Sequence, residues 1–224
     1  MAHATVAFAL AARAHGRDGR PLKSRETLER MRSAAGSFAG ERPGLVAGPT
    51  QVVDAGTVVM LLASPEAVLP AARTVAHAAH PASTTFSAAM SGLERSESPD
   101  QQLDPAILVA ERAASEAADR IGEADFREAR FIVAGPPPGD LLGVLLGLIL
   151  ETYDAMTDRQ RQIVELVRES DTQQKVATHL GVSRQAVNQS LLAAGWPYLE
   201  RAEAVAVREL SAMWRAGFDG YAGG

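Results

Sequence analysis

The chain has 224 residues, of which 46% are hydrophobic and 22% are charged, the balance of a globular protein with one large domain or two small ones. It contains no cysteine, which excludes a disulfide framework, a thiolate metal site and a cysteine nucleophile. The formal net charge of −5 means that any site for an anionic partner must be local.

Neither a signal peptide nor a membrane span is expected. No basic residue precedes the apolar stretch near the first residue, as a signal peptide would require. The most apolar run, 141–150, has ten residues between Asp140 and Glu151, whereas a span needs about 20. We therefore expect a cytoplasmic protein in which this run forms a buried helix.

The first part of the chain alternates strands and helices. Ser24 is placed to cap a helix, and Ser64-Pro65-Glu66 combines a cap, a first-position proline and an early acid. Asp54-Ala55-Gly56, between two valine-rich runs, is a hairpin signal. We expect strands at 4–11, 45–53, 57–62, 83–92 and 128–134, and helices at 24–38, 64–80 and 104–122.

This order of elements predicts an α+β domain with a ferredoxin-like, βαββαβ-type arrangement. Prolines at 136–138 then interrupt regular structure, and no strand is expected after Asp140. We therefore divide the chain into a ferredoxin-like sensory or dimerisation domain (1–139), a connecting helix (140–156) and an all-helical domain (157–224) that ends in a long helix.

Residues 172–195, which read TQQKVATHLGVSRQAVNQSLLAAG, have the pattern of a helix-turn-helix. Ala177 is small where two helices would cross, Gly181 suits a turn with positive φ, and Ser183 is placed to cap the second helix. We expect a buried face formed by both helices and by a preceding helix at 158–169, comprising Val176, Leu180, Val182, Val187, Leu191, Ile163, Val164 and Val167.

If those residues are buried, the second helix exposes polar side chains suited to the major groove of DNA. Arginine can make a bidentate hydrogen bond to guanine, and Asn and Gln can do so to adenine. The start of the first helix offers backbone N–H groups to phosphate. The predicted DNA-binding residues are Thr172, Gln173, Gln174, Lys175, Ser183, Arg184, Gln185, Asn188 and Gln189.

The local charge of this segment also favours DNA. No Asp or Glu occurs from Thr172 to Leu199, where about three would be expected from the 27 acids in 224 residues. Lys175 and Arg184 are present in the same window. A helical interaction module that never meets DNA is the alternative interpretation of the segment.

The segment after Pro197 predicts a helix rather than the hairpin of a winged helix-turn-helix. Apolar residues recur at helical spacing over 198–216, which favours core packing or a dimer contact over a ligand site.

Several stretches resemble those of a known family. They are DPAILVAERA at 104–113, MTDRQRQIVELV at 156–167, QQKVATHLGVSRQAV at 173–187 and LAAGW at 192–196. With them the chain resembles the SatD family of prokaryotic proteins. The resemblance implies an N-terminal domain similar to degenerate nucleotidyl cyclase or GGDEF domains, followed by a helix-turn-helix. MTDRQRQIVELV also resembles region-four sigma-factor and LuxR-type DNA-binding domains.

The residues that cyclase-type catalysis needs are missing from the predicted elements. Two divalent ions require several carboxylates, but the first strand contains no acid and the hairpin offers only Asp54, which we interpret as a turn residue. His77 and His80 lie three apart on a helix, but no third metal ligand is apparent. We therefore expect no enzyme activity, no metal site and no cofactor.

Together these features predict a sequence-specific transcriptional regulator that binds double-stranded DNA through the helix at 184–195. Since one helix-turn-helix contacts few bases, a homodimer on a palindromic site is expected. The N-terminal domain would dimerise, sense an unknown small-molecule effector, or both. The alternatives are a divergent nucleotide-processing enzyme tethered to a DNA-binding module and a protein-interaction adaptor.

Overall fold

The computed structural model describes residues 6–16, 19–53, 56–92, 112–113, 115–121, 130–134, 139–170 and 172–222. The chain divides into two compact units, one of Met1–Val144 with Val207–Gly224 and one of Leu145–Ala206. The division falls within helices α4 (Gly139–Ala155) and α8 (Trp196–Ala222), so each of them contributes to both units. The boundaries predicted from the sequence kept all of this last helix in the helical domain.

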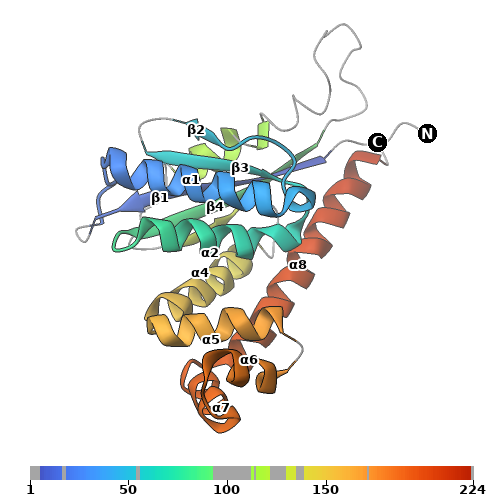
Figure 1. Ribbon diagram of the computed structural model, residues 1–224. Coiled ribbons are helices and arrows are strands. Elements are labelled where there is room, and N and C mark those ends of the chain that lie inside the picture. The colour runs from blue at the N-terminus through green and yellow to red at the C-terminus, as the bar shows by residue number, and fades with distance from the viewer. Residues whose placement is uncertain are drawn as a thin grey trace, which may run out of the picture. The chain divides into compact units, whose positions relative to one another are not determined.

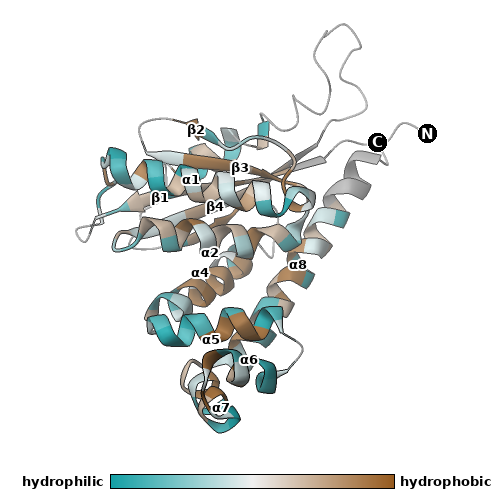
Figure 2. Ribbon diagram, viewed as in Figure 1, coloured by the Kyte–Doolittle hydropathy of each residue, from teal (hydrophilic) through white to brown (hydrophobic). Residues whose placement is uncertain are grey.

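The first unit is an α+β structure built on a five-stranded sheet in the order β2-β3-β1-β4-β5. Figure 1 labels the first four of these strands. The central strand β1 is antiparallel to β3 and β4, β2 is antiparallel to β3, and β5 is parallel to β4. Every residue of β3 is buried, and this strand is apolar along most of its length in Figure 2. The strands are β1 (Val6–His15), β2 (Gln51–Val53), β3 (Thr57–Leu62), β4 (Ser83–Gly92) and β5 (Phe131–Val133).

Helices α1 (Arg25–Glu41) and α2 (Val68–Ala79) lie side by side on one face of the sheet (Figure 1). As expected, Ser24 caps α1, because its hydroxyl accepts a hydrogen bond from the Thr27 N–H at 3.2 Å. Ser64 makes no such bond, and the chain first forms a short 3-10 turn, Pro65–Ala67, before α2 begins.

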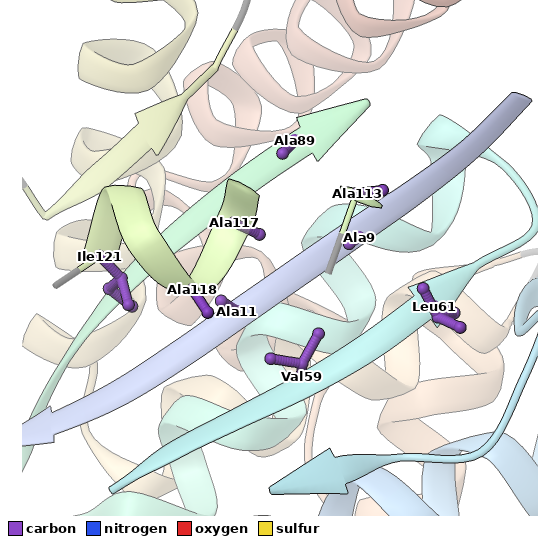
Figure 3. Packing of buried hydrophobic residues seen from close by; sticks show 9 residues of the cluster. All are labelled: Ala9, Ala11, Val59, Leu61, Ala89, Ala113, Ala117, Ala118 and Ile121. Atoms are coloured by element: carbon purple, nitrogen blue, oxygen red, sulfur yellow. The ribbon is translucent and has the colours of Figure 1, made fainter. Parts of the chain in front are cut away.

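The opposite face of the sheet carries small side chains and is covered by the helical residues 115–121 (Figure 3). Alanines occupy both sides of this contact, which lets helix and sheet approach closely. The buried cluster comprises Ala9, Ala11, Val59, Leu61, Ala89, Ala113, Ala117, Ala118 and Ile121. The predicted start of this helix at Asp104-Pro105 lies outside the described residues, as does Asp54 of the hairpin.

Two glycines place the beginning of α4 against the backbone of β5. A Cβ atom on Gly143 would lie 2.7 Å from the carbonyl oxygen of Phe131, and one on Gly139 would lie 2.8 Å from that of Val133. Neither position therefore has room for a side chain unless the helix moves away from the strand.

The expectation that the apolar run at 141–150 is buried is only half right. Leu142 and Leu146 are buried, but Leu141, Val144 and Leu148 are exposed. Most residues of the helix are apolar, and much of its ribbon is coloured as hydrophobic in Figure 2. Packing on one side therefore leaves aliphatic groups on the other. Among the helices that the structure describes, none combines the length and apolar character of a membrane span.

The last part of α8, from Val207, packs against other residues of the first unit. The ring centroids of Trp214 and Phe8 are 5.6 Å apart, and the Ser211 hydroxyl donates a hydrogen bond to Glu66 at 3.2 Å. Leu210 is fully buried. In this part of the helix, the apolar residues that recur over 198–216 therefore take part in core packing, one of the two roles expected from the sequence.

The close approach of α4 to β5 predicts opposite effects of two Gly-to-Ala changes. Gly143→Ala should lower the free energy of unfolding by about 1–3 kcal/mol, because its Cβ meets a carbonyl oxygen. Gly36→Ala, in α1 with open space around it, should raise it by about 0.5–1 kcal/mol through better helix propensity. Urea denaturation measures both, and equal effects would contradict the proposed packing.

Burial of His15 predicts that the protein loses stability on mild acidification. This side chain, 4% exposed at the end of β1, has a pKa lowered from 6.5 by burial, while a hydrogen bond to the Gly19 backbone partly opposes the shift and the Arg13 charge adds to it. Because its pKa is lower in the folded state, the folded state binds this proton less readily than the unfolded chain does, and the free energy of unfolding should fall as the pH drops below 6.5. We expect His15→Gln to flatten the dependence of the urea midpoint between pH 8 and 5, and the exposed-site control His77→Gln to retain it.

Candidate nucleic-acid interface

Three short helices of the second unit form the candidate interface, and a Ser or Thr side chain caps the N-terminus of each. Helix α5 (Asp158–Glu169) starts with a capping box, in which Thr157 and Gln160 exchange hydrogen bonds of 3.3 and 2.8 Å. Helix α6 (Gln173–Leu180) is capped by Thr172, whose hydroxyl accepts from the Lys175 N–H at 3.3 Å. Helix α7 (Arg184–Ala193) follows three residues later.

The turn between α6 and α7 confirms the predicted helix-turn-helix geometry. Gly181 adopts the left-handed conformation at φ +65°, and the next N–H, that of Val182, donates to the Ala177 carbonyl at 3.0 Å. Ser183 then caps α7 by accepting from the Ala186 N–H at 3.1 Å. Ala177 is only 1% exposed, in keeping with its predicted place at the helix crossing.

The core beneath the turn is largely the one expected. Val176, Val187 and Leu191 are buried together with Ile163 and Val164 of α5, whereas Leu180 and Val167 are half-buried. One prediction is wrong, because Val182 is 36% exposed. It lies in the turn between the helices, where helical periodicity no longer decides which way a side chain points.

The outer face of α7 is polar and exposed. Val187 and Leu191 occupy its inner side, and Asn188 and Gln189, which lie between them in the sequence, face away from the core. Of the nine predicted DNA-binding residues, Gln173 is half-buried and the others are exposed: Thr172, Gln174, Lys175, Ser183, Arg184, Gln185, Asn188 and Gln189. The structure thus gathers Ser183, Arg184, Gln185, Asn188 and Gln189 at the first turns of one helix.

No carboxylate side chain lies in the sequence window that contains this face. The exposed cations Lys175 and Arg184 fall within the window from Thr172 to Leu199, which has no Asp or Glu. An approaching phosphate would therefore meet two cations and no acid from this window.

One contact that the sequence did not indicate joins the chain before and after the helix-turn-helix. The guanidinium of Arg168, at the end of α5, donates to both carboxylate oxygens of Glu203 in α8, at 2.7 and 2.6 Å. The same guanidinium lies 4.5 Å from the ring centroid of Trp196 and 5.4 Å from that of Tyr153. These residues, which we call the Arg168 clamp, tie α4, α5 and α8 together within the second unit. Arg168 and Glu203 are 35 positions apart in the chain, so no local sequence pattern indicates that they form a pair.

The described residues give no support to a metal site. Within them, no group of three His, Cys, Asp or Glu side chains is placed to hold an ion. His77 and His80 are both exposed at the end of α2.

The comparison with known protein families bears on the same three helices. Residues 154–194 match the family Sigma-70, region 4. The C-terminal part of the chain is therefore a helix-turn-helix DNA-binding domain, and the match covers α5, α6 and α7. A comparison with curated proteins finds no match.

The Arg168 clamp predicts a large loss of stability when one partner is removed. Arg168→Ala removes the guanidinium that pairs with the nearly buried Glu203 carboxylate and should cost about 3–5 kcal/mol, measured by urea denaturation. Arg161→Ala is the matched control, because its partner Asp158 is 96% exposed and the pair is worth less than about 1 kcal/mol.

The double variant Arg168→Met with Glu203→Leu should recover most of this loss, because apolar groups can replace a buried ion pair. If Arg168→Ala and Arg161→Ala lower the free energy of unfolding by similar amounts, the Arg168 clamp does not hold the helices together.

Proposed function

We propose that this protein is a sequence-specific, DNA-binding transcriptional regulator that acts in the cytoplasm as a homodimer. The observation that carries the proposal is the outer face of α7, where Arg184, Gln185, Asn188 and Gln189 are exposed together in a helix-turn-helix. These are side-chain types that hydrogen-bond base edges in the major groove.

Each part of the motif has a role in this proposal. The first turns of α7 enter the major groove, Arg184 pairs with a guanine, and Asn188 or Gln189 pairs with an adenine. Thr172, Gln174 and the backbone N–H groups at the start of α6 hold a neighbouring phosphate and so fix the register of α7.

The homodimer follows from the small footprint of a single motif. One recognition helix contacts too few base pairs for tight specific binding, whereas two copies related by a two-fold axis read a palindrome. In this proposal the N-terminal domain dimerises, responds to a small-molecule effector, or does both.

We further propose that the N-terminal domain is a ferredoxin-like, non-enzymatic domain of a SatD-type protein. The antiparallel order β2-β3-β1-β4, with α1 after β1 and α2 after β3, supports the fold proposal. The absence of any acid from the strand Val6–His15 supports the proposal of no cyclase-type catalysis, since such a site needs carboxylates there.

Sequencing of genomic fragments retained by the purified full-length protein tests the function. We expect a small set of related, two-fold symmetric sequences, bound with an affinity that falls steeply as the salt concentration rises.

Fluorescence anisotropy of variants tests the reading helix. Arg184→Ala and Asn188→Ala should each lose about 1–3 kcal/mol of binding free energy at one base pair per half-site and relax the base preference there. Arg208→Ala, an exposed arginine outside the motif, is the matched control and should leave the preference unchanged.

Three results would each overturn a part of the proposal. Retention of fragments without any common sequence would exclude specific recognition, and unchanged base preference in both α7 variants would exclude α7 as the reading helix. Sedimentation of the complex gives the number of copies on one site, and a single copy would exclude the homodimer.

A further inference from the structure

The outer face of α7 includes an apolar residue that the polar pattern does not explain. Leu192 is 60% exposed, and it follows Gln185 and Asn188 at intervals of three or four residues. At 3.6 residues per turn these side chains form one stripe. Leu191, its neighbour, is the residue that enters the core.

A single exposed leucine is common on protein surfaces and by itself indicates nothing. The position of Leu192 is what distinguishes it, because it continues a stripe of base-reading side-chain types. The stripe also lies within the acid-free window from Thr172 to Leu199, so no carboxylate of that window would repel the phosphates of a nucleic acid.

We propose that Leu192 contacts the 5-methyl group of a thymine in the major groove. The inference rests on the proposed function. The thymine methyl is the apolar group that a base pair presents there, so an exposed aliphatic side chain on the reading face has one natural contact. Leu192 lies about 12 Å along the helix from Arg184, a distance of three to four base-pair steps, and therefore within the same half-site.

Replacement of thymine by uracil tests the contact, since it removes the methyl group and leaves every hydrogen-bonding group in place. A specifically bound duplex from the fragment selection is remade with uracil at one thymine at a time. We expect one position per half-site at which the full-length protein binds about fourfold more weakly, the factor for one buried methyl group.

The variants assign that loss to the side chain. Leu192→Ala should bind the thymine and uracil duplexes equally, whereas Leu192→Met, which keeps an apolar side chain, should still distinguish them. Leu148→Ala is the matched control, because it makes the same change at a leucine that is 56% exposed on α4, and it should keep the wild-type difference.

The outcomes separate the inference from the function on which it rests. If no duplex is bound specifically, both fail. If specific binding occurs but no uracil substitution weakens it, or Leu192→Ala remains as sensitive to uracil as the wild type, the function stands and the inference is overturned. Loss of self-association in Leu192→Ala with an unchanged uracil effect would likewise overturn it and assign the residue to a contact between copies.

Discussion

The pairing of Arg168 with Glu203 is the contact on which the geometry of the DNA-binding unit depends. Arg168 ends the helix before the motif, and Glu203 lies in the helix after it, so the two-point hydrogen bond closes a loop that contains α6, the turn and α7. The ring of Trp196 covers the same guanidinium three residues after α7 ends. Because a bidentate arginine pair allows few orientations, it restricts how α5 and α8 can lie relative to each other.

Such a pair contributes more to specificity of arrangement than to net stability. Removing two charges from water is costly, and apolar side chains of similar volume can give equal stability. Apolar groups, however, would not fix the orientation of α8 on α5 through two directional hydrogen bonds. The aromatic faces of Trp196 and Tyr153 reduce the desolvation cost by giving the guanidinium a favourable surface where it has no carboxylate.

Within the motif, α7 packs through one side only. Val187 and Leu191 anchor one side of the helix, which leaves the other side free for polar residues. In the first unit, close packing instead depends on side chains that are small or absent. Alanine side chains form most of the contact between the sheet and residues 115–121, so the two can lie close together. Gly143, which has no side chain, allows α4 to touch the β5 backbone.

Most of the helix-turn-helix was determined by the sequence itself, because its signals are local. The need for a small residue at Ala177, a left-handed turn at Gly181 and a cap at Ser183 arises from contacts within a few residues. Helical periodicity was also sufficient to predict that Arg184 and Asn188 are exposed, once Val187 was assigned to the core.

The same reasoning failed at two places. Val182 lies in the turn and is partly exposed, and the apolar run in α4 contains more aliphatic groups than one packed side can cover. Tertiary structure alone decided the Arg168–Glu203 pair, the packing of Trp214 on Phe8, and the place of Gly143 against β5. The first two join segments far apart in the chain, and the third joins a strand to the helix that follows it. In each case no local preference of either segment specifies which surface it will meet.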